Sequence, residues 1–144
     1  MKIRQVRRFS IRIFETVKRL LPQLDPNAEM LTEEKFRSIL RSESTHFFIA
    51  EASDKKIAGI LSAVVYIIPT GKKFWIEDVV VDQAFRGKGI GRELMLNAIE
   101  FAKYAGVKSV DLTSKASRIA ANKLYQDLGF VLRETNVYRF VLRK

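Results

Sequence analysis

Three glycines within five residues separate a run of valines from a long amphipathic pattern. The stretch VVVDQAFRGKGIGREL, which begins at Val79, carries them as Gly87, Gly89 and Gly91. Strand-like, glycine-rich and helical segments in this order are typical of folds in which a helix packs against a sheet. Glycine lets a backbone approach a ligand closely, and the free amides at a helix start attract anions. The stretch therefore predicts an anion-binding loop that opens a helix.

Basic side chains flank these glycines, at Arg86, Lys88 and Arg92. Two well-known glycine motifs do not fit the spacing. A dinucleotide fingerprint needs a further glycine where Arg92 stands, and its glycines begin at the end of the strand, whereas DQAF intervenes here. The lysine followed by Ser or Thr of a Walker A loop is also absent after the last glycine. A plain flexible turn stays open as the alternative.

Hydrophobic periodicity predicts eleven elements in the order β-α-α-β-β-β-α-β-α-β-β. A helix with apolar positions from Ile11 to Leu21 should end where PQLDPN breaks the pattern, and Thr32 should cap the next helix. The glycine loop should open a helix that ends at Gly106. Short turns between the middle strands predict an antiparallel meander. The expected strands cover residues 3–6, 46–52, 57–68, 73–82, 107–112 and a final pair within 130–142, and the last helix lies within 117–129.

Composition bounds the class of protein. A chain of 144 residues with 47% hydrophobic residues is predicted to form one domain over 1–144. The absence of cysteine excludes disulfides and thiolate chemistry, and His46 as the single histidine excludes a His-rich metal site, so no metal is expected. Arginines interrupt the apolar residues of the amino terminus, which argues against a signal peptide or membrane span and predicts a soluble, cytoplasmic protein.

The formal net charge of +10 indicates an affinity for polyanions. Nucleic acid, anionic lipid and a phosphate-rich small molecule all satisfy that charge. No recognition-helix motif, RNA-binding aromatic motif or zinc site supports a nucleic-acid-binding module. That class is retained only as a lower-ranked alternative, and neither nucleic acid nor a membrane is expected as a partner.

Two carboxylates, Glu77 and Asp78, interrupt an otherwise apolar strand. Burying a carboxylate is costly unless it is paired or used in chemistry. Regular alternation predicts that Glu77 shares a face with Val79 and Val81, and that Asp78 shares a face with Ile76 and Val80. One of the two should therefore point toward an approaching ligand. A structural ion pair is the alternative.

Together with a second motif, these features resemble the GNAT superfamily of acyl-CoA-dependent N-acetyltransferases. Arg86, Gly89 and Gly91 match its glycine signature, and LYQDLGF, from Leu124 to Phe130, is similar to its second motif. The resemblance covers essentially the full length. It implies a three-layer α/β/α fold around a mixed, mostly antiparallel, splayed sheet. Arg118 stands where relatives often have asparagine, and Asn122 lies nearby as a substitute.

The resemblance implies acetyl-CoA as the cofactor. Its pyrophosphate would sit on the amides of residues 87–92, and its pantetheine arm would lie beside the preceding strand like an added strand. The residues expected to bind it are Val79, Val80, Val81, Arg86, Gly87, Lys88, Gly89, Ile90, Gly91, Arg92 and Asn122.

Acetyl transfer to a primary amine needs a base, because an alkylamine with a pKa of about 10 is mostly protonated in solution. Glu77 is the expected base, directly or through water, and Asp78 is the reserve. A backbone amide near Val79 should polarise the acetyl carbonyl. Tyr125 is expected to protonate the departing thiolate, although a tyrosine at such a place is often only packed.

A GNAT-like domain that senses acyl-CoA without catalysis is the second alternative. It would keep the glycines while dispensing with Glu77 and Tyr125, and both are present, so catalysis ranks first. The acceptor amine carries no readable motif: a sugar amine, a polyamine, an antibiotic and a protein amine all remain open. A homodimer is also left open.

Overall fold

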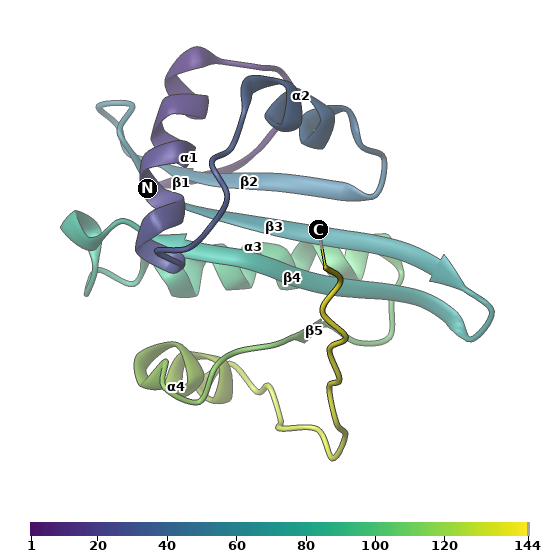
Figure 1. Ribbon diagram of the computed structural model, residues 1–144. Coiled ribbons are helices and arrows are strands. Elements are labelled where there is room, and N and C mark those ends of the chain that lie inside the picture. The colour runs from purple at the N-terminus through teal and green to yellow at the C-terminus, as the bar shows by residue number, and fades with distance from the viewer. Residues whose placement is uncertain (144) are drawn as a thin grey trace. The chain divides into compact units, whose positions relative to one another are not determined.

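The computed structural model describes residues 1–143, and they divide into two compact units. The first unit is Met1–Thr113, and the second begins at Ser114 (Figure 1). The single domain expected over 1–144 stays a prediction. Among the helices of residues 1–143, none is both long enough and apolar enough to cross a membrane.

A mixed five-stranded sheet forms the centre of the first unit, in the order β1-β2-β3-β4-β5. The first four strands pair antiparallel with their sequence neighbours, and β5 pairs parallel with β4. Short turns join the middle strands, so these strands form an antiparallel meander. This arrangement confirms the predicted sheet type. The strands are β1 (Lys2–Val6), β2 (Thr45–Glu51), β3 (Ile57–Ile68), β4 (Gly71–Val81) and β5 (Asp111–Leu112).

Helices α1 (Ile11–Leu24) and α2 (Glu33–Arg41) cover one face of this sheet. The predicted cap is present, because the Thr32 hydroxyl accepts a hydrogen bond from the Lys35 amide at 3.2 Å. The predicted break before Pro22 is wrong, since α1 continues to Leu24. Proline removes one hydrogen bond, but Leu21 and Leu24 still pack against the core and sustain the helix.

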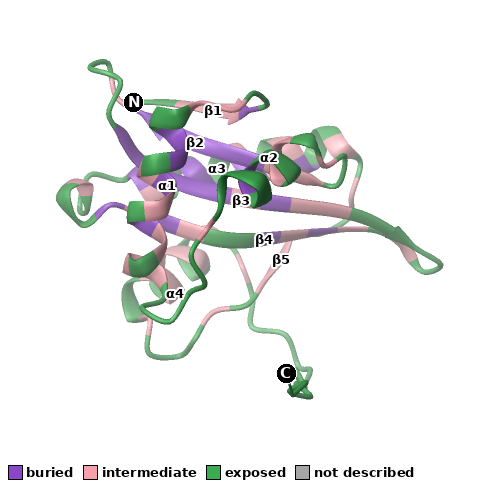
Figure 2. Ribbon diagram, turned by 45° about the horizontal axis from the view of Figure 1, so that its top comes forward, coloured by how far each residue is buried: buried purple, intermediate pink, exposed green. Residues whose placement is uncertain are grey.

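Four phenylalanines join α1, α2 and the sheet. The ring centroids of Phe14 and Phe36 lie 5.9 Å apart, and those of Phe36 and Phe47 lie 5.4 Å apart in an edge-on pair. Phe9 packs against Phe14 and Phe36. Figure 2 shows the buried residues along the middle strands and on the inner side of α1. This aromatic cluster packs α1 against the sheet. The sequence pattern predicts only that these positions are buried, and it does not predict that the rings contact one another.

Helix α3 (Ile90–Ala105) covers the opposite face, so the unit has the three layers that the sequence predicts. Phe101 of α3 lies against His46, Phe48 and Phe74, with ring centroids 4.8, 5.3 and 6.1 Å away. The helix ends at Gly106 in a left-handed conformation, with φ of 75°, which confirms the predicted cap.

The second unit contains α4 (Ile119–Asp127). The final pair of strands predicted within 130–142 is absent, because residues 130–143 form neither helix nor strand. A strand needs a neighbour for its backbone hydrogen bonds, and apolar alternation alone does not supply one. The predicted strand over 107–112 is likewise reduced to Asp111–Leu112. Large apolar side chains of this last segment are exposed, at Val131, Leu132, Val137, Tyr138, Phe140, Val141 and Leu142.

Candidate functional site

A β-bulge interrupts β4 where the two predicted carboxylates lie. Glu77 pairs with Ser62 and Val80 pairs with Ile60, so two residues of β4 stand opposite one residue of β3. Asp78 occupies the bulge with a φ of 49°. Aspartate tolerates this left-handed region better than most residues, which explains its place directly before the β-branched run of Val79 to Val81.

The bulge overturns the predicted sharing of faces between Asp78, Ile76 and Val80. Ile76 lies two residues from Phe74, whose ring faces Phe101 of α3, and no irregularity separates them. Val80 instead belongs to the buried cluster with α1 and α2. One extra residue in the strand reverses the alternation, so Ile76 and Val80 point to opposite faces.

The same correction applies to Glu77 and Val81, which were predicted to share a face. Ser62 pairs with both Phe47 and Glu77, so Glu77 lies on the α1 and α2 side. Val81 pairs with Gly59, where an added methyl group would meet Leu94 of α3 at 3.0 Å. Glu77 and Val81 therefore face opposite layers.

Both carboxylates remain in contact with solvent. Partial burial raises the pKa of Glu77 above its ordinary value, and the negative charge of Asp78 raises it further. Burial also raises the pKa of Asp78. No salt bridge to either carboxylate occurs among residues 1–143, so the structural ion pair considered as an alternative does not form there. A carboxylate with a raised pKa and no partner cation is suited to accept a proton.

The outer edge of β4 is only partly paired. β5 pairs with Trp75 and Ile76 and with no later residue of β4. Within residues 1–143, the edge from Glu77 to Val81 thus has no strand beside it, which is the splay expected of this sheet. Backbone groups along such an edge are available to a ligand that bears amides.

A short turn, η1 (Gln83–Phe85), connects this edge to the glycine loop. Gly87 and Gly89 have φ values of 78° and 77°, in the left-handed region where glycine is favoured. A methyl group added at either would meet no atom within 4 Å. The space on this side of the loop is open, so both glycines leave room for a close approach.

Helix α3 begins directly after Gly89 without a side-chain cap. Its first intrahelical bond runs from the Glu93 amide to the Gly89 carbonyl at 3.1 Å. The amides of residues 90–92 precede that bond and have no acceptor within the helix. An uncapped helix start with its positive dipole is an anion-binding site by geometry alone.

The basic residues of the loop are exposed. Arg86 folds back and donates from Nε to the Val81 carbonyl at 3.2 Å, and the Lys88 ammonium lies 5.3 Å from the centre of the Phe85 ring. Arg86 therefore links the start of the glycine loop to the end of β4 by a hydrogen bond, and it also adds positive charge. Arg92 lies in the first turn of α3. Every predicted residue of the first unit, from Glu77 to Arg92, lies on β4, in the glycine loop or in the first turn of α3.

Tyr125 and Asn122 belong to the second unit, on α4. Burial raises the pKa of Tyr125, and the nearby charge of Arg118 partly opposes that rise. The ring of Tyr125 packs against Phe130, with centroids 6.1 Å apart. Asn122 donates from Nδ2 to the Lys115 carbonyl at 2.9 Å, so its amide secures the segment before α4.

Comparison with known proteins then decides the family. The model of the acetyltransferase (GNAT) family matches residues 11–130, which include the bulged strand, the glycine loop and α4. The chain belongs to the GNAT family.

Curated relatives are named N-acetyltransferases. An uncharacterized N-acetyltransferase of Methanocaldococcus jannaschii is 31% identical over 101 residues, which cover 69% of this chain and 45% of that protein. Human N-acetyltransferase 8B is 32% identical over 96 residues, covering 65% of this chain and 42% of that protein. The matched region thus spans less than half the length of these GNAT relatives.

Solved structures share the fold at lower identity. An aminoglycoside acetyltransferase from an uncultured soil metagenomic sample superposes with a TM-score of 0.86 and 21% identity, covering 99% of this chain and 96% of that one. A Trypanosoma brucei acetyltransferase gives a TM-score of 0.77 and 22% identity, with 97% and 99% covered. The GNAT fold predicted from the sequence is confirmed by these neighbours.

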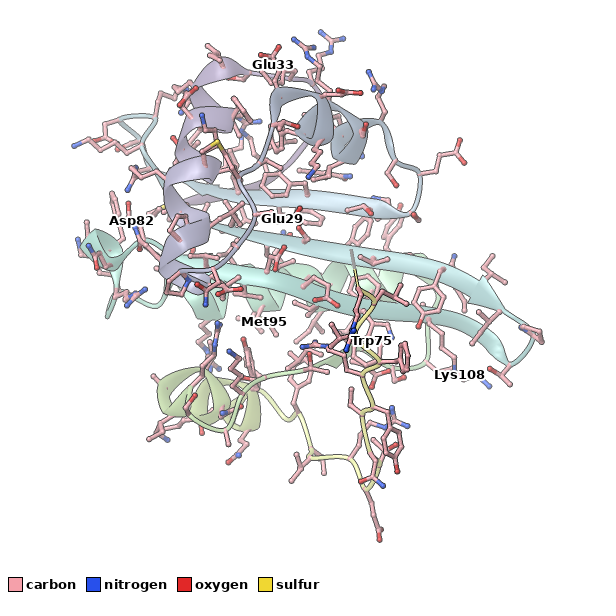
Figure 3. The ribbon with its side chains drawn as sticks, viewed as in Figure 1. Glu29, Glu33, Trp75, Asp82, Met95 and Lys108 are labelled. Carbon is pink, nitrogen blue, oxygen red and sulfur yellow. The ribbon has the colours of Figure 1, made fainter. Side chains whose placement is uncertain are left out.

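Sequence reasoning missed the residues that hold the GNAT glycine loop in place. Asp82, which directly follows β4 and is labelled in Figure 3, is 4% exposed. Its carboxylate forms an ion pair with Arg19 and accepts a hydrogen bond from Gln23, both on α1. An aspartate directly after a β-branched run and two residues before an alanine amide is a recognisable turn signal. Nothing local links it to α1, about 60 residues earlier, because tertiary packing alone makes that contact. Within residues 1–143, no cluster of side chains is suited to hold a metal ion.

Proposed function

We propose that this chain transfers an acetyl group from acetyl-CoA to a primary amine by direct attack. One observation carries the proposal: the unpaired outer edge of β4 leads through a glycine loop into the uncapped start of α3. A ligand with amides at one end and phosphates at the other matches the strand edge and the helix start in the order in which they occur. Coenzyme A has that chemistry, and GNAT proteins use its acetyl thioester.

The residues present fit this cofactor. The amides of residues 90–92 would hold the pyrophosphate, and the open side of Gly87 and Gly89 leaves space for it. Exposed Lys88 and Arg92 add positive charge at the same place. The edge of β4 from Val79 to Val81 would pair with the pantetheine amides. When bound, acetyl-CoA supplies an activated acyl group on a leaving thiolate.

Glu77 is assigned the base. It lies at the bulge, next to the unpaired edge, with a raised pKa and no salt-bridge partner among residues 1–143. It would take a proton from the acceptor ammonium, directly or through one water, so that the neutral amine attacks. Asp78 is the second candidate, because burial raises its pKa as well.

Two further groups complete the assignment. The β-bulge leaves backbone groups near Val79 out of the regular ladder, and an amide there would stabilise the developing oxyanion. Tyr125 would protonate the departing thiolate. A tyrosine phenol is already protonated at neutral pH, which is the form an acid needs, and burial raises its pKa further.

The acceptor is proposed only as a primary amine. Related proteins include an N-acetylaspartate synthetase and an aminoglycoside acetyltransferase, whose names indicate different amines. The present chain carries no acceptor motif that selects between them. A cytoplasmic location and a homodimer also remain predictions from the sequence.

Thiol release from acetyl-CoA over an amine panel tests the proposal. The panel should contain an amino sugar, a polyamine, an aminoglycoside, aspartate and a lysine peptide. Release with at least one amine above the buffer rate is expected. Saturable acetyl-CoA binding without release from any amine would instead favour the sensing domain, and absence of binding would contradict both.

A further inference from the structure

Two side chains of α1 form an ion pair and hydrogen bonds with the turn that precedes the glycine loop. Arg19 places Nη1 2.9 Å from Oδ2 of Asp82, and Gln23 donates from Nε2 to Oδ1 of Asp82 at 3.4 Å. The Gln83 amide donates to Oε1 of Gln23 at 2.9 Å. Gln23 therefore engages the side chain of one turn residue and the backbone of the next.

Arg19 and Gln23 reach this turn from one face of α1, because residues four apart on a helix are neighbours. Asp82 is 4% exposed. Burial alone would raise its pKa, but hydrogen bonds from the Ala84 amide, Arg19 and Gln23 outweigh burial and hold the pKa below its ordinary value. The carboxylate thus stays ionised at neutral pH, and the contact to α1 persists.

Asp82 in turn shapes the segment that leads into the loop. Its side chain accepts from the Ala84 amide at 3.2 Å, and its carbonyl accepts from the Phe85 amide at 2.8 Å. These bonds form the turn that delivers Arg86 and Gly87. The glycines themselves have wide conformational freedom, so the loop depends on its anchored end for a defined position. Figure 3 shows Asp82 beside α1 at the end of β4.

We infer that Gln23, with Arg19, is a positioning residue for the cofactor loop, acting through Asp82 and the Gln83 amide. This inference rests on the proposed function, since it assigns the loop to coenzyme A. Neither side chain touches the ligand. Their effect is to hold the loop in its binding conformation before the ligand arrives, which lowers the ordering cost of binding.

Gln23→Met tests this assignment, because methionine keeps the length of the side chain and removes both hydrogen bonds. The dissociation constant of coenzyme A, measured by calorimetry, should rise about fivefold, the equivalent of one net hydrogen bond. The kcat at saturating acetyl-CoA should stay within about twofold, because no group that contacts the reacting atoms changes. The hydrogen-bonded amides 83–86 of the free protein should exchange hydrogen faster than in the wild type.

Gln5→Met is the matched control. Gln5 makes a part-buried side-chain contact with Nδ1 of His46 at 3.1 Å, away from the loop. Gln5→Met should leave the coenzyme A affinity and the exchange of amides 83–86 unchanged. Arg19→Met serves as the second variant. Combined with Gln23→Met, it should weaken binding by less than the product of the single effects, since both act through Asp82.

The outcomes separate this inference from the proposed function. Wild-type protein that binds coenzyme A while Gln23→Met binds equally well overturns the positioning role and leaves the proposed function standing. Weakened binding with unchanged loop exchange also overturns it, because the loop would then be ordered without Gln23. Wild-type protein that fails to bind coenzyme A overturns the proposed function, and this inference with it.

Discussion

Ile76 and Val80 are four residues apart on β4, yet they are buried on opposite faces of the sheet. An even spacing should place them on the same face. The extra residue at Asp78 accounts for the reversal, and it lies where β4 also loses its outer neighbour. The bulge therefore sets the direction of Glu77 and frees backbone groups at the same point of the strand.

The backbone at Asp78 predicts an unusual pattern of stability. Asp78→Asn and Asp78→Gly should unfold at nearly the same urea concentration as the wild type, because both residues tolerate positive φ. Asp78→Val should lose about 1 to 2 kcal/mol, the cost of a left-handed conformation for a branched residue. Urea unfolding followed by circular dichroism measures this difference.

Glu77→Val supplies the control for that series. Among residues 1–143, Lys55 and Asp78 are the non-glycine residues with positive φ, so Glu77 has an ordinary strand backbone. Valine is favoured in such a strand, and the exposed side chain of Glu77 packs little. Equal losses at both positions would show that the bulge is not the cause.

The two ends of α3 offer a matched test of the cofactor loop. Gly89 and Gly106 have φ values of 77° and 75°, and an added methyl group meets no atom within 4 Å at either. Gly89→Val and Gly106→Val should therefore lose similar stability, about 1 to 2 kcal/mol. Acetyl-CoA should raise the melting temperature of the wild type and of Gly106→Val, while Gly89→Val should show no rise. A rise in all three proteins would place the ligand elsewhere.

Tyr125→Phe should lower turnover while leaving the affinity for acetyl-CoA nearly unchanged. Loss of the hydroxyl removes a proton donor, an effect of about a hundredfold on kcat, and little packing. Steady-state kinetics with a thiol reagent and calorimetric binding measure the two quantities. Tyr104→Phe, at a residue of α3 that is 95% exposed, is the control and should change neither. Equal loss of binding and turnover in Tyr125→Phe would indicate a packed, structural tyrosine.

Local patterns predict most of the first unit. Thr32 and Gly106 cap the helices as expected, and the strand predicted over 57–68 forms at Ile57–Ile68. These features depend on neighbouring residues, which the sequence displays directly. The glycine loop and the helix that it opens were predicted for the same reason.

Features that depend on distant residues could not be predicted in this way. The bulge at Asp78 arises from a mismatch between β3 and β4, and alternation along one strand does not reveal it. The contact of Gln23 with Asp82 requires α1 to be docked on the sheet. The strands expected within 130–142 had the correct alternation but found no pairing partner. Each feature that was not predicted depends on strand pairing or on side-chain packing, and a pattern along the sequence does not determine either.

Low pH should destabilise the protein, because the Glu51 carboxylate becomes protonated. Hydrogen bonds from Arg4 and Arg12 lower the pKa of this carboxyl, which is 6% exposed, from 4.5 to about 2. Because the folded pKa is depressed, the ionised group stabilises the fold above pH 4.5, and this contribution is lost as pH falls toward 2. Glu51→Gln should lose about 1 to 2 kcal/mol at pH 7, because its arginine partners are 35% and 46% exposed and solvent screens the pair, and the gap to the wild type should close in acid. Glu34→Gln, at an exposed position, should track the wild type throughout.

Glu77→Gln tests the base. The raised pKa of Glu77 means that the carboxylate ionises at a higher pH than an ordinary glutamate, so the acid limb of the wild-type rate profile should lie above the ordinary glutamate value. The variant should fold, bind acetyl-CoA, and lose rate most severely at low pH, where the acceptor amine is protonated. High pH should partly restore the rate, because solution then supplies neutral amine.

Asp78→Asn completes the Glu77 experiment, since it removes the neighbouring charge and keeps a residue that tolerates the bulge. Loss of the Asp78 charge should lower the pKa of Glu77, because that charge contributes to its rise, and should shift the acid limb to lower pH. A larger, pH-rescued defect in Asp78→Asn than in Glu77→Gln would identify Asp78 as the base. Wild-type pH profiles in both variants would make the two acids structural and leave proton removal to water or to a group of the substrate.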